Sequence, residues 1–140
     1  MEFYELILVS VFLLVFVVFL LAYFTPVYTK EESISYWVGQ DIGIEPNYRV
    51  VPGKAELTIK NNWGQEVRIL DISFDGRGGI REINLKNREA ADIEVLDIPK
   101  CVPGTKYSYK VSILFQDVRS QKNFLIEGKI PLVGICEKEE

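Results

Sequence analysis

Residues 6–24 form a run of nineteen residues without a charge, and apart from Ser10 and Tyr23 all of them are apolar. In an α-helix of about 1.5 Å per residue this run is roughly 28 Å long, close to the hydrocarbon thickness of a bilayer. The chain must therefore place an apolar helix in lipid or against other helices. Pro26 lacks a backbone N–H and disfavours a helical conformation in the residue before it, so we expect the helix to break there.

A cleavable secretory signal is an alternative interpretation of this segment. Such a signal has a basic N-terminal region, a shorter apolar core and a cleavage site between small residues. Here the preceding charges are acidic, the core is long, and the tripeptide at 22–24, Ala-Tyr-Phe, is a poor cleavage site. We therefore predict a retained helix over 1–26, a linker over 27–33 and a second domain over 34–140.

The rest of the chain shows the alternation of half-buried strands. Apolar and polar residues alternate strictly over 55–60, for example, and turn sequences rich in Gly, Pro and Asn separate such segments. The predicted strands are residues 35–38, 48–51, 55–60, 67–74, 80–85, 91–96, 106–115 and 123–132. No segment after Pro26 shows convincing helical periodicity. The pattern predicts an α+β chain, in which the long apolar helix is followed by an immunoglobulin-like antiparallel β-sandwich.

The chain has two cysteines, Cys101 and Cys136. They are either joined in a disulfide or remain two unrelated buried thiols. A retained membrane-type helix before a β domain favours a location outside the cytoplasm, where disulfides persist, so we predict the bond. Two cysteines without any histidine do not supply the four ligands of a structural zinc site, and no metal is expected.

Composition argues against several classes of function. Without histidine the chain has no Ser-His-Asp or Cys-His arrangement. Its sixteen basic residues are interspersed with acids, and the net charge is −4, so no surface for nucleic acid is expected. Asp71 and Asp75 are expected on solvated faces, and Trp63 either binds a ligand or packs back on its own sheet. We predict neither an enzyme nor a cofactor.

Glu5 stands just before the apolar run, and no Lys or Arg precedes Lys30. In one interpretation the helix anchors a single-pass membrane protein that displays its β domain as an extracytoplasmic binding module. Such an anchor normally has basic residues on its cytoplasmic flank, whereas here Lys30 is followed directly by Glu31 and Glu32. In the other interpretation Met1 is a mature N-terminus left by removal of a basic leader, with its ammonium four residues before Glu5.

In these features the chain resembles the type IV pilins, and more closely the archaeal ones. The mature chain of that family begins with an apolar helix that often has a glutamate at its fifth position. Glu5 and the unbroken Leu, Val, Ile and Phe after it match this pattern over residues 1–25. The remainder matches as architecture and in the turn phrases at 60–65 and 102–107. The resemblance implies a structural subunit of an extracellular adhesive pilus, embedded in the membrane before assembly and polymerising with copies of itself.

The resemblance also implies assembly roles for residues of the helix. A carboxylate in an apolar filament core needs a partner, and the ammonium of a neighbouring copy's Met1 would serve Glu5, with its own amine as the intrachain alternative. Four aromatic residues recur at helical spacing on one face: Phe12, Phe16, Phe19 and Tyr23. We predict that this face is the seam where helices interlock, although a plain anchor can have the same composition.

Overall fold

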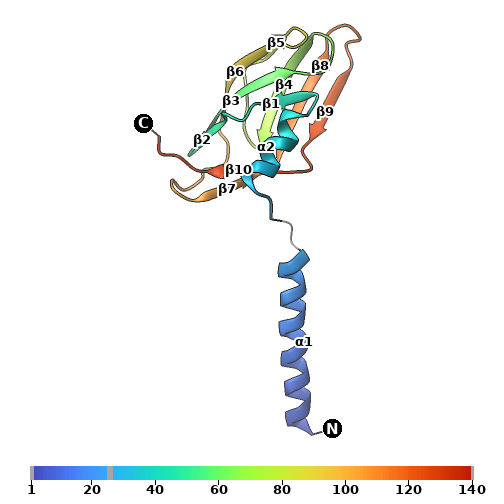
Figure 1. Ribbon diagram of the computed structural model, residues 1–140, viewed down its shortest axis with the longest axis vertical. Coiled ribbons are helices and arrows are strands. Elements are labelled where there is room, and N and C mark those ends of the chain that lie inside the picture. Colours follow the sequence, from blue (N-terminus) through green and yellow to red (C-terminus); the bar gives the residue numbers. More distant parts are fainter. Residues whose placement is uncertain (1, 25–26, 140) are drawn as a thin grey trace.

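The computed structural model describes residues 2–24 and 27–139, and it consists of a long helix that extends away from a β domain (Figure 1). Helix α1 spans Phe3–Phe24. Its segment Phe3–Leu21 has a mean hydropathy of 2.8, so its length and composition suffice to cross a membrane. None of this segment is buried. The helix-breaking role of Pro26 stays a prediction because Pro26 lies outside the described residues.

A second helix, α2, spans Lys30–Val38. The strand predicted at 35–38 is therefore wrong, and so is the expectation that no helix follows Pro26. A capping box starts α2: the Thr29 hydroxyl accepts a hydrogen bond from the Glu32 N–H, and the Glu32 carboxylate accepts one from the Thr29 N–H. The aromatic and β-branched residues of this segment favour a strand. The two capping hydrogen bonds and the packing of Trp37 in the core stabilise a helix instead.

In the described part of the chain, the strands form three antiparallel sheets. The first contains β1 (Ile42–Ile44), β2 (Arg49–Val51), β3 (Lys54–Asn61) and β6 (Ala90–Leu96), with β3 paired to the other three. The second has the order β5 (Ile83–Leu85), β4 (Val67–Phe74), β8 (Val111–Asp117) and β9 (Asn123–Glu127). The third pairs β7 (Lys106–Tyr109) with β10 (Leu132–Ile135). The chain is thus α+β, as predicted, while the immunoglobulin-like sandwich stays a prediction.

Two predicted strands are each divided in the structure. The segment 106–115 breaks at Lys110, whose backbone N–H donates to the Asp75 carboxylate and whose carbonyl accepts from the Asp75 N–H. The segment 123–132 breaks after β9 at Gly128, where a Cβ would collide with the ring of Trp37. Both breaks depend on residues distant in sequence, so alternation alone could not locate them. The short strand β1 was not predicted.

One hydrophobic core joins the sheets. The buried apolar residues of β3, β4 and β8 belong to a single cluster with Trp37 of α2 and Tyr107 and Tyr109 of β7. Because the inward faces of the sheets and one face of α2 share this core, the β domain and α2 form one unit. The helix α1 takes no part in that cluster.

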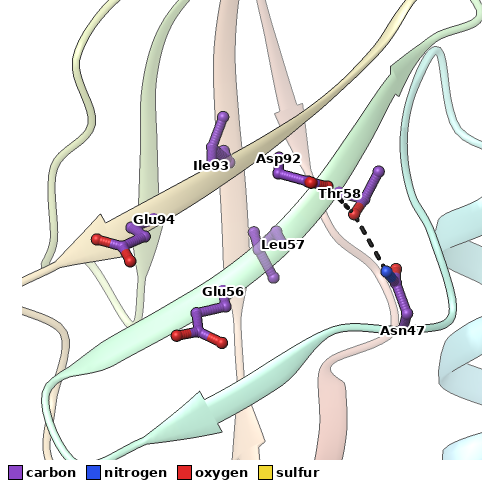
Figure 2. A pocket seen from close by; sticks show the side chains of 7 residues that line it. All are labelled: Asn47, Glu56, Leu57, Thr58, Asp92, Ile93 and Glu94. Atoms are coloured by element: carbon purple, nitrogen blue, oxygen red, sulfur yellow. Dashed lines mark hydrogen bonds between the residues drawn. The ribbon is translucent and has the colours of Figure 1, made fainter.

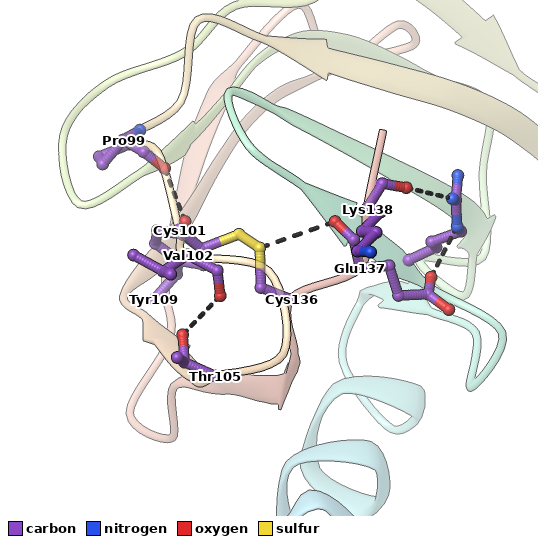
Figure 3. The surroundings of a disulfide bond; sticks show 9 residues. Pro99, Cys101, Val102, Thr105, Tyr109, Cys136, Glu137 and Lys138 are labelled. Atoms are coloured by element: carbon purple, nitrogen blue, oxygen red, sulfur yellow. Dashed lines mark hydrogen bonds and ion pairs between the residues drawn. A yellow bond between two sulfur atoms is a disulfide. The ribbon is translucent and has the colours of Figure 1, made fainter. Parts of the chain in front are cut away.

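Cys101 and Cys136 are joined by a disulfide with a Cα–Cα distance of 5.9 Å, which confirms the predicted bond (Figure 3). Backbone hydrogen bonds of 2.8 Å surround it: Cys136 N–H donates to the Thr105 carbonyl, and Gly104 N–H donates to the Cys136 carbonyl. The disulfide therefore lies at the end of the β7–β10 ribbon where Lys106 pairs with Ile135. Beyond it, Glu137 pairs with Arg49 at 2.6 Å, which holds the C-terminal segment against β2.

Removing this disulfide should destabilise the β domain. The bridged cysteines are 35 residues apart, and closing a loop of that size contributes roughly 3–4 kcal/mol through the entropy of the unfolded chain. The double variant Cys101→Ser/Cys136→Ser should lower the free energy of unfolding by about that amount, as measured by urea unfolding of the full chain in detergent. The same shift should follow reduction of the wild type. An unchanged unfolding midpoint in both cases would contradict the prediction.

Candidate assembly site on the apolar helix

The side chains of α1 present an extended apolar surface. Half or more of each phenylalanine of the predicted aromatic face is exposed, with values of 71% for Phe12, 50% for Phe16 and 66% for Phe19. A contiguous apolar surface of this kind is unfavourable in water and marks a site of contact with lipid or protein. The helix is therefore expected to contact either a bilayer or other helices.

Glu5 lies on the same face of α1 as these phenylalanines. At 3.6 residues per turn, residues 5, 12, 16 and 19 fall within an arc of about 60°. The Glu5 N–H donates to the Glu2 carbonyl at 3.1 Å, so the acid sits in the first turn of the helix. There the positive end of the helix dipole favours a carboxylate. The acid and the aromatic row therefore lie along one stripe of the helix, a relationship that the sequence spacing contains but that the predicted role of Glu5 did not use.

The other polar group in the run is already satisfied within the helix. The Ser10 hydroxyl donates to the Leu6 carbonyl at 2.9 Å, which removes the cost of placing a hydroxyl in an apolar environment. Glu5 is thus the charged residue that an apolar environment has to accommodate within Phe3–Leu21. Met1 and the Tyr23 side chain lie outside the described residues, so their assembly roles stay predictions.

Helix α2, the element that follows α1 in the chain, is hydrogen-bonded to the β domain. The Ser33 hydroxyl donates to the Pro131 carbonyl at 2.8 Å and accepts from the Val133 N–H at 3.1 Å. The indole N–H of Trp37 donates to the Ile130 carbonyl at 3.0 Å. These bonds tie α2 to the start of β10, the strand that the disulfide holds. The element that follows α1 is therefore part of the rigid domain.

The other residues considered from sequence have structural roles. Trp63 packs against both Phe115 and Phe124, at ring-centroid distances of 5.2 and 4.8 Å, and its indole N–H donates to Asp117 at 2.9 Å. That hydrogen bond holds the pKa of Asp117 below its usual range. Trp63 thus packs back on its own sheet, the second of the two predicted alternatives.

Asp75 accepts a hydrogen bond from the Lys110 backbone N–H at the corner between β7 and β8, and this contact fixes the turn.

A shallow hollow on the outer face of β3 and β6 is lined mainly by polar side chains (Figure 2). Thr58 bridges Asn47 and Asp92 by hydrogen bonds, and both Glu56 and Glu94 lie within 4 Å of the Lys54 ammonium. The carboxylates therefore already have partners. Across residues 2–24 and 27–139, no three or more His, Cys, Asp or Glu side chains are grouped so that they could hold a metal ion.

Comparison with known proteins does not assign the chain to a family: no family model matches it, and no curated protein is significantly similar in sequence. The apolar N-terminal helix followed by antiparallel sheets is a pilin-like architecture. Together with the disulfide, the helix indicates secretion or membrane association.

Proposed function

We propose that this protein is a structural subunit of an extracellular type IV-like pilus and polymerises through α1. The observation that carries the proposal is the stripe formed by Glu5 and the phenylalanines on one face of a helix of which no part is buried over Phe3–Leu21. A helix that only anchors a domain in lipid needs apolar residues all round and no particular face. A helix that packs against copies of itself needs a defined face, and a charge there needs a defined partner.

Electrostatics gives Glu5 its role in this proposal. A carboxylate inside an apolar bundle is costly unless it is paired and hydrogen-bonded. The ammonium of Met1 from a neighbouring copy supplies that pair and fixes the axial offset between subunits. The aromatic row then interlocks with the adjacent helices, because aromatic side chains bury the largest area per residue. Before assembly the same helix resides in the membrane.

The β domain forms the outer surface of the filament in this proposal, with an immunoglobulin-like sandwich as its fold. Its disulfide suits an extracellular position. Adhesion to surfaces or cells is the biological role that the pilin resemblance implies. The competing function is a membrane-anchored binding module, which would use the same helix and domain without polymerising.

A truncation on the aromatic face distinguishes the two functions. Phe16→Ala should reduce the yield of sheared filaments by at least about ten-fold, because large-to-small changes in packed cores cost several kcal/mol. Membrane retention of unassembled subunits should stay unchanged, since the helix remains apolar. Yields are compared by quantitative immunoblotting of sheared and membrane fractions.

Leu14→Ala is the control for this experiment, because residue 14 lies about half a helical circumference from Glu5. It should reduce filament yield less than Phe16→Ala. If neither change alters the amount of extracellular polymer, the aromatic face has no role in assembly. If all protein stays in membranes, the anchored-module function is favoured instead.

A further inference from the structure

We propose that neighbouring β domains also pair edge to edge, with β9 of one copy docked in the groove between β5 and β6 of the next. This inference rests on the proposed filament and adds to it a second contact, outside the helix core. The argument uses two open sheet edges, their charges and their positions on the domain.

The groove opens where the chain leaves one sheet for another. Gly79 and Leu96 exchange two backbone hydrogen bonds of 3.0 and 3.1 Å, and residues 80–83 then cross to β5 in the second sheet. The divergence leaves a groove of about 730 Å³. Its apolar lining consists of Ile80, Ile83, Ile93 and Leu96.

The backbone of β6 faces this groove with unused hydrogen-bonding groups. The N–H and C=O of Leu96 point away from β3, toward Gly79. Alternate residues of a strand point the same way, so the backbone groups of Asp92 and Glu94 also point away from β3. No hydrogen bond to them exists in the described part of the chain. This is an open edge that can accept another strand.

Strand β9 is an open edge as well. The Lys122 carbonyl accepts from the Asp117 N–H at 2.9 Å, and the Gly128 N–H donates to the Val111 carbonyl at 3.0 Å, so even-numbered residues bond to β8. The odd-numbered residues therefore present their backbone groups to solvent: Asn123, Leu125 and Glu127. The Leu125 side chain, at the centre of this edge, is 56% exposed.

Charge and position select a second copy as the partner. Four acids and one base line the groove: Glu82, Asp92, Glu94, Asp97 and Arg81. The Lys54 ammonium lies 3.7 Å from the Glu94 carboxylate, and with this solvent-exposed pair included the acids still outnumber the bases. Three basic residues flank β9 in sequence, and the strand itself ends with one acid, Glu127. The basic residues are Arg119, Lys122 and Lys129. These edges are complementary, whereas two β9 edges would bring like charges together. Figure 1 shows β6 and β9 on opposite sides of the domain, so the contact joins unlike edges of successive copies, which is the kind of contact that can propagate along a helical filament.

Carbodiimide cross-linking of wild-type filaments tests this pairing, because the reagent joins lysine to carboxylate without a spacer. We expect isopeptides between Lys122 or Lys129 and the acids Asp92, Glu94 or Asp97, identified by peptide mass spectrometry. The same links should be at least ten-fold weaker in subunits dispersed in detergent, which controls for links within one chain. Filaments that cross-link elsewhere and lack these isopeptides would overturn the inference but leave the proposed filament intact.

A proline at the edge gives an independent test. Leu125→Pro removes an outward N–H that does not bond to β8, so the domain keeps its ladder and its unfolding midpoint. The isopeptide yield should fall at least ten-fold, and the filaments should dissociate at lower temperature. Leu125→Ala, which keeps the N–H, should have a smaller effect. Proline filaments with wild-type links and thermal stability would overturn the inference, whereas a wild type that forms no filament would overturn both proposals.

Discussion

Replacing Glu5 with alanine should reduce filament assembly at least ten-fold while leaving the β domain folded. The carboxylate lies in the first turn of α1, on the face shared with the phenylalanines, and far in sequence from every residue of the hydrophobic core. Its loss would leave the ammonium of a neighbouring subunit unpaired inside the apolar bundle. The cost of breaking a buried charge pair is about 3–5 kcal/mol, more than enough for this loss.

Two measurements separate assembly from folding for this variant. Filament yield is measured in sheared material by immunoblotting and electron microscopy, and the fold of the β domain by near-ultraviolet circular dichroism of detergent-dispersed subunits. Glu5→Gln, which keeps the size but not the charge, should be as defective as Glu5→Ala if the pair is ionic. A glutamine variant that assembles normally would show that the charge of Glu5 has no role in assembly.

Replacing Trp37 with alanine should lower the free energy of unfolding of the β domain by about 3–5 kcal/mol, as for other buried large-to-small changes. Trp37 is fully buried, and its indole N–H holds the Ile130 carbonyl at 3.0 Å. The change would leave both a cavity and an unpaired carbonyl next to β10. Because α2 directly follows the segment that leads from α1, loss of this contact should also loosen the attachment of the domain to the filament core.

Urea unfolding followed by Trp63 fluorescence measures the effect, since Trp63 lies in the loop between β3 and β4 and packs against Phe115 of β8 and Phe124 of β9. Trp37→Phe should be intermediate, because it refills part of the space without the N–H. Tyr36→Phe, which removes a hydroxyl that accepts from the Lys129 N–H at 2.9 Å, should cost only about 1 kcal/mol. Equal stabilities for Trp37→Ala and Tyr36→Phe would show that α2 is not an integral part of the core.

Alternation predicted those strands whose two faces differ in environment. Residues 55–60 and 67–74 lie within β3 and β4 because alternate side chains enter one core. Helix α2 was missed because nine residues make too few turns for a helical period to be recognised. The capping box of Thr29 and Glu32 was nevertheless a signal that the sequence contains. The divisions at Lys110 and Gly128 arise from contacts with Asp75 and Trp37, which no local pattern contains.

The candidate assembly site could be found from sequence because an acid directly before a long uncharged run, with no basic residue near it, is conspicuous. The open edges of β6 and β9 could not. Which backbone groups remain unpaired depends on the order of strands in a sheet, and alternation of side chains does not encode that order. The groove beside β6 likewise exists only because residues 80–83 change sheets.

Electron cryomicroscopy of the sheared filaments tests the central claim most directly. A helical reconstruction should place α1 in a bundle along the filament axis, with the Glu5 carboxylate within about 4 Å of the terminal ammonium of a neighbouring subunit and the β domains outside. A filament whose subunits contact one another only through β domains, with α1 still in lipid or detergent, would contradict it.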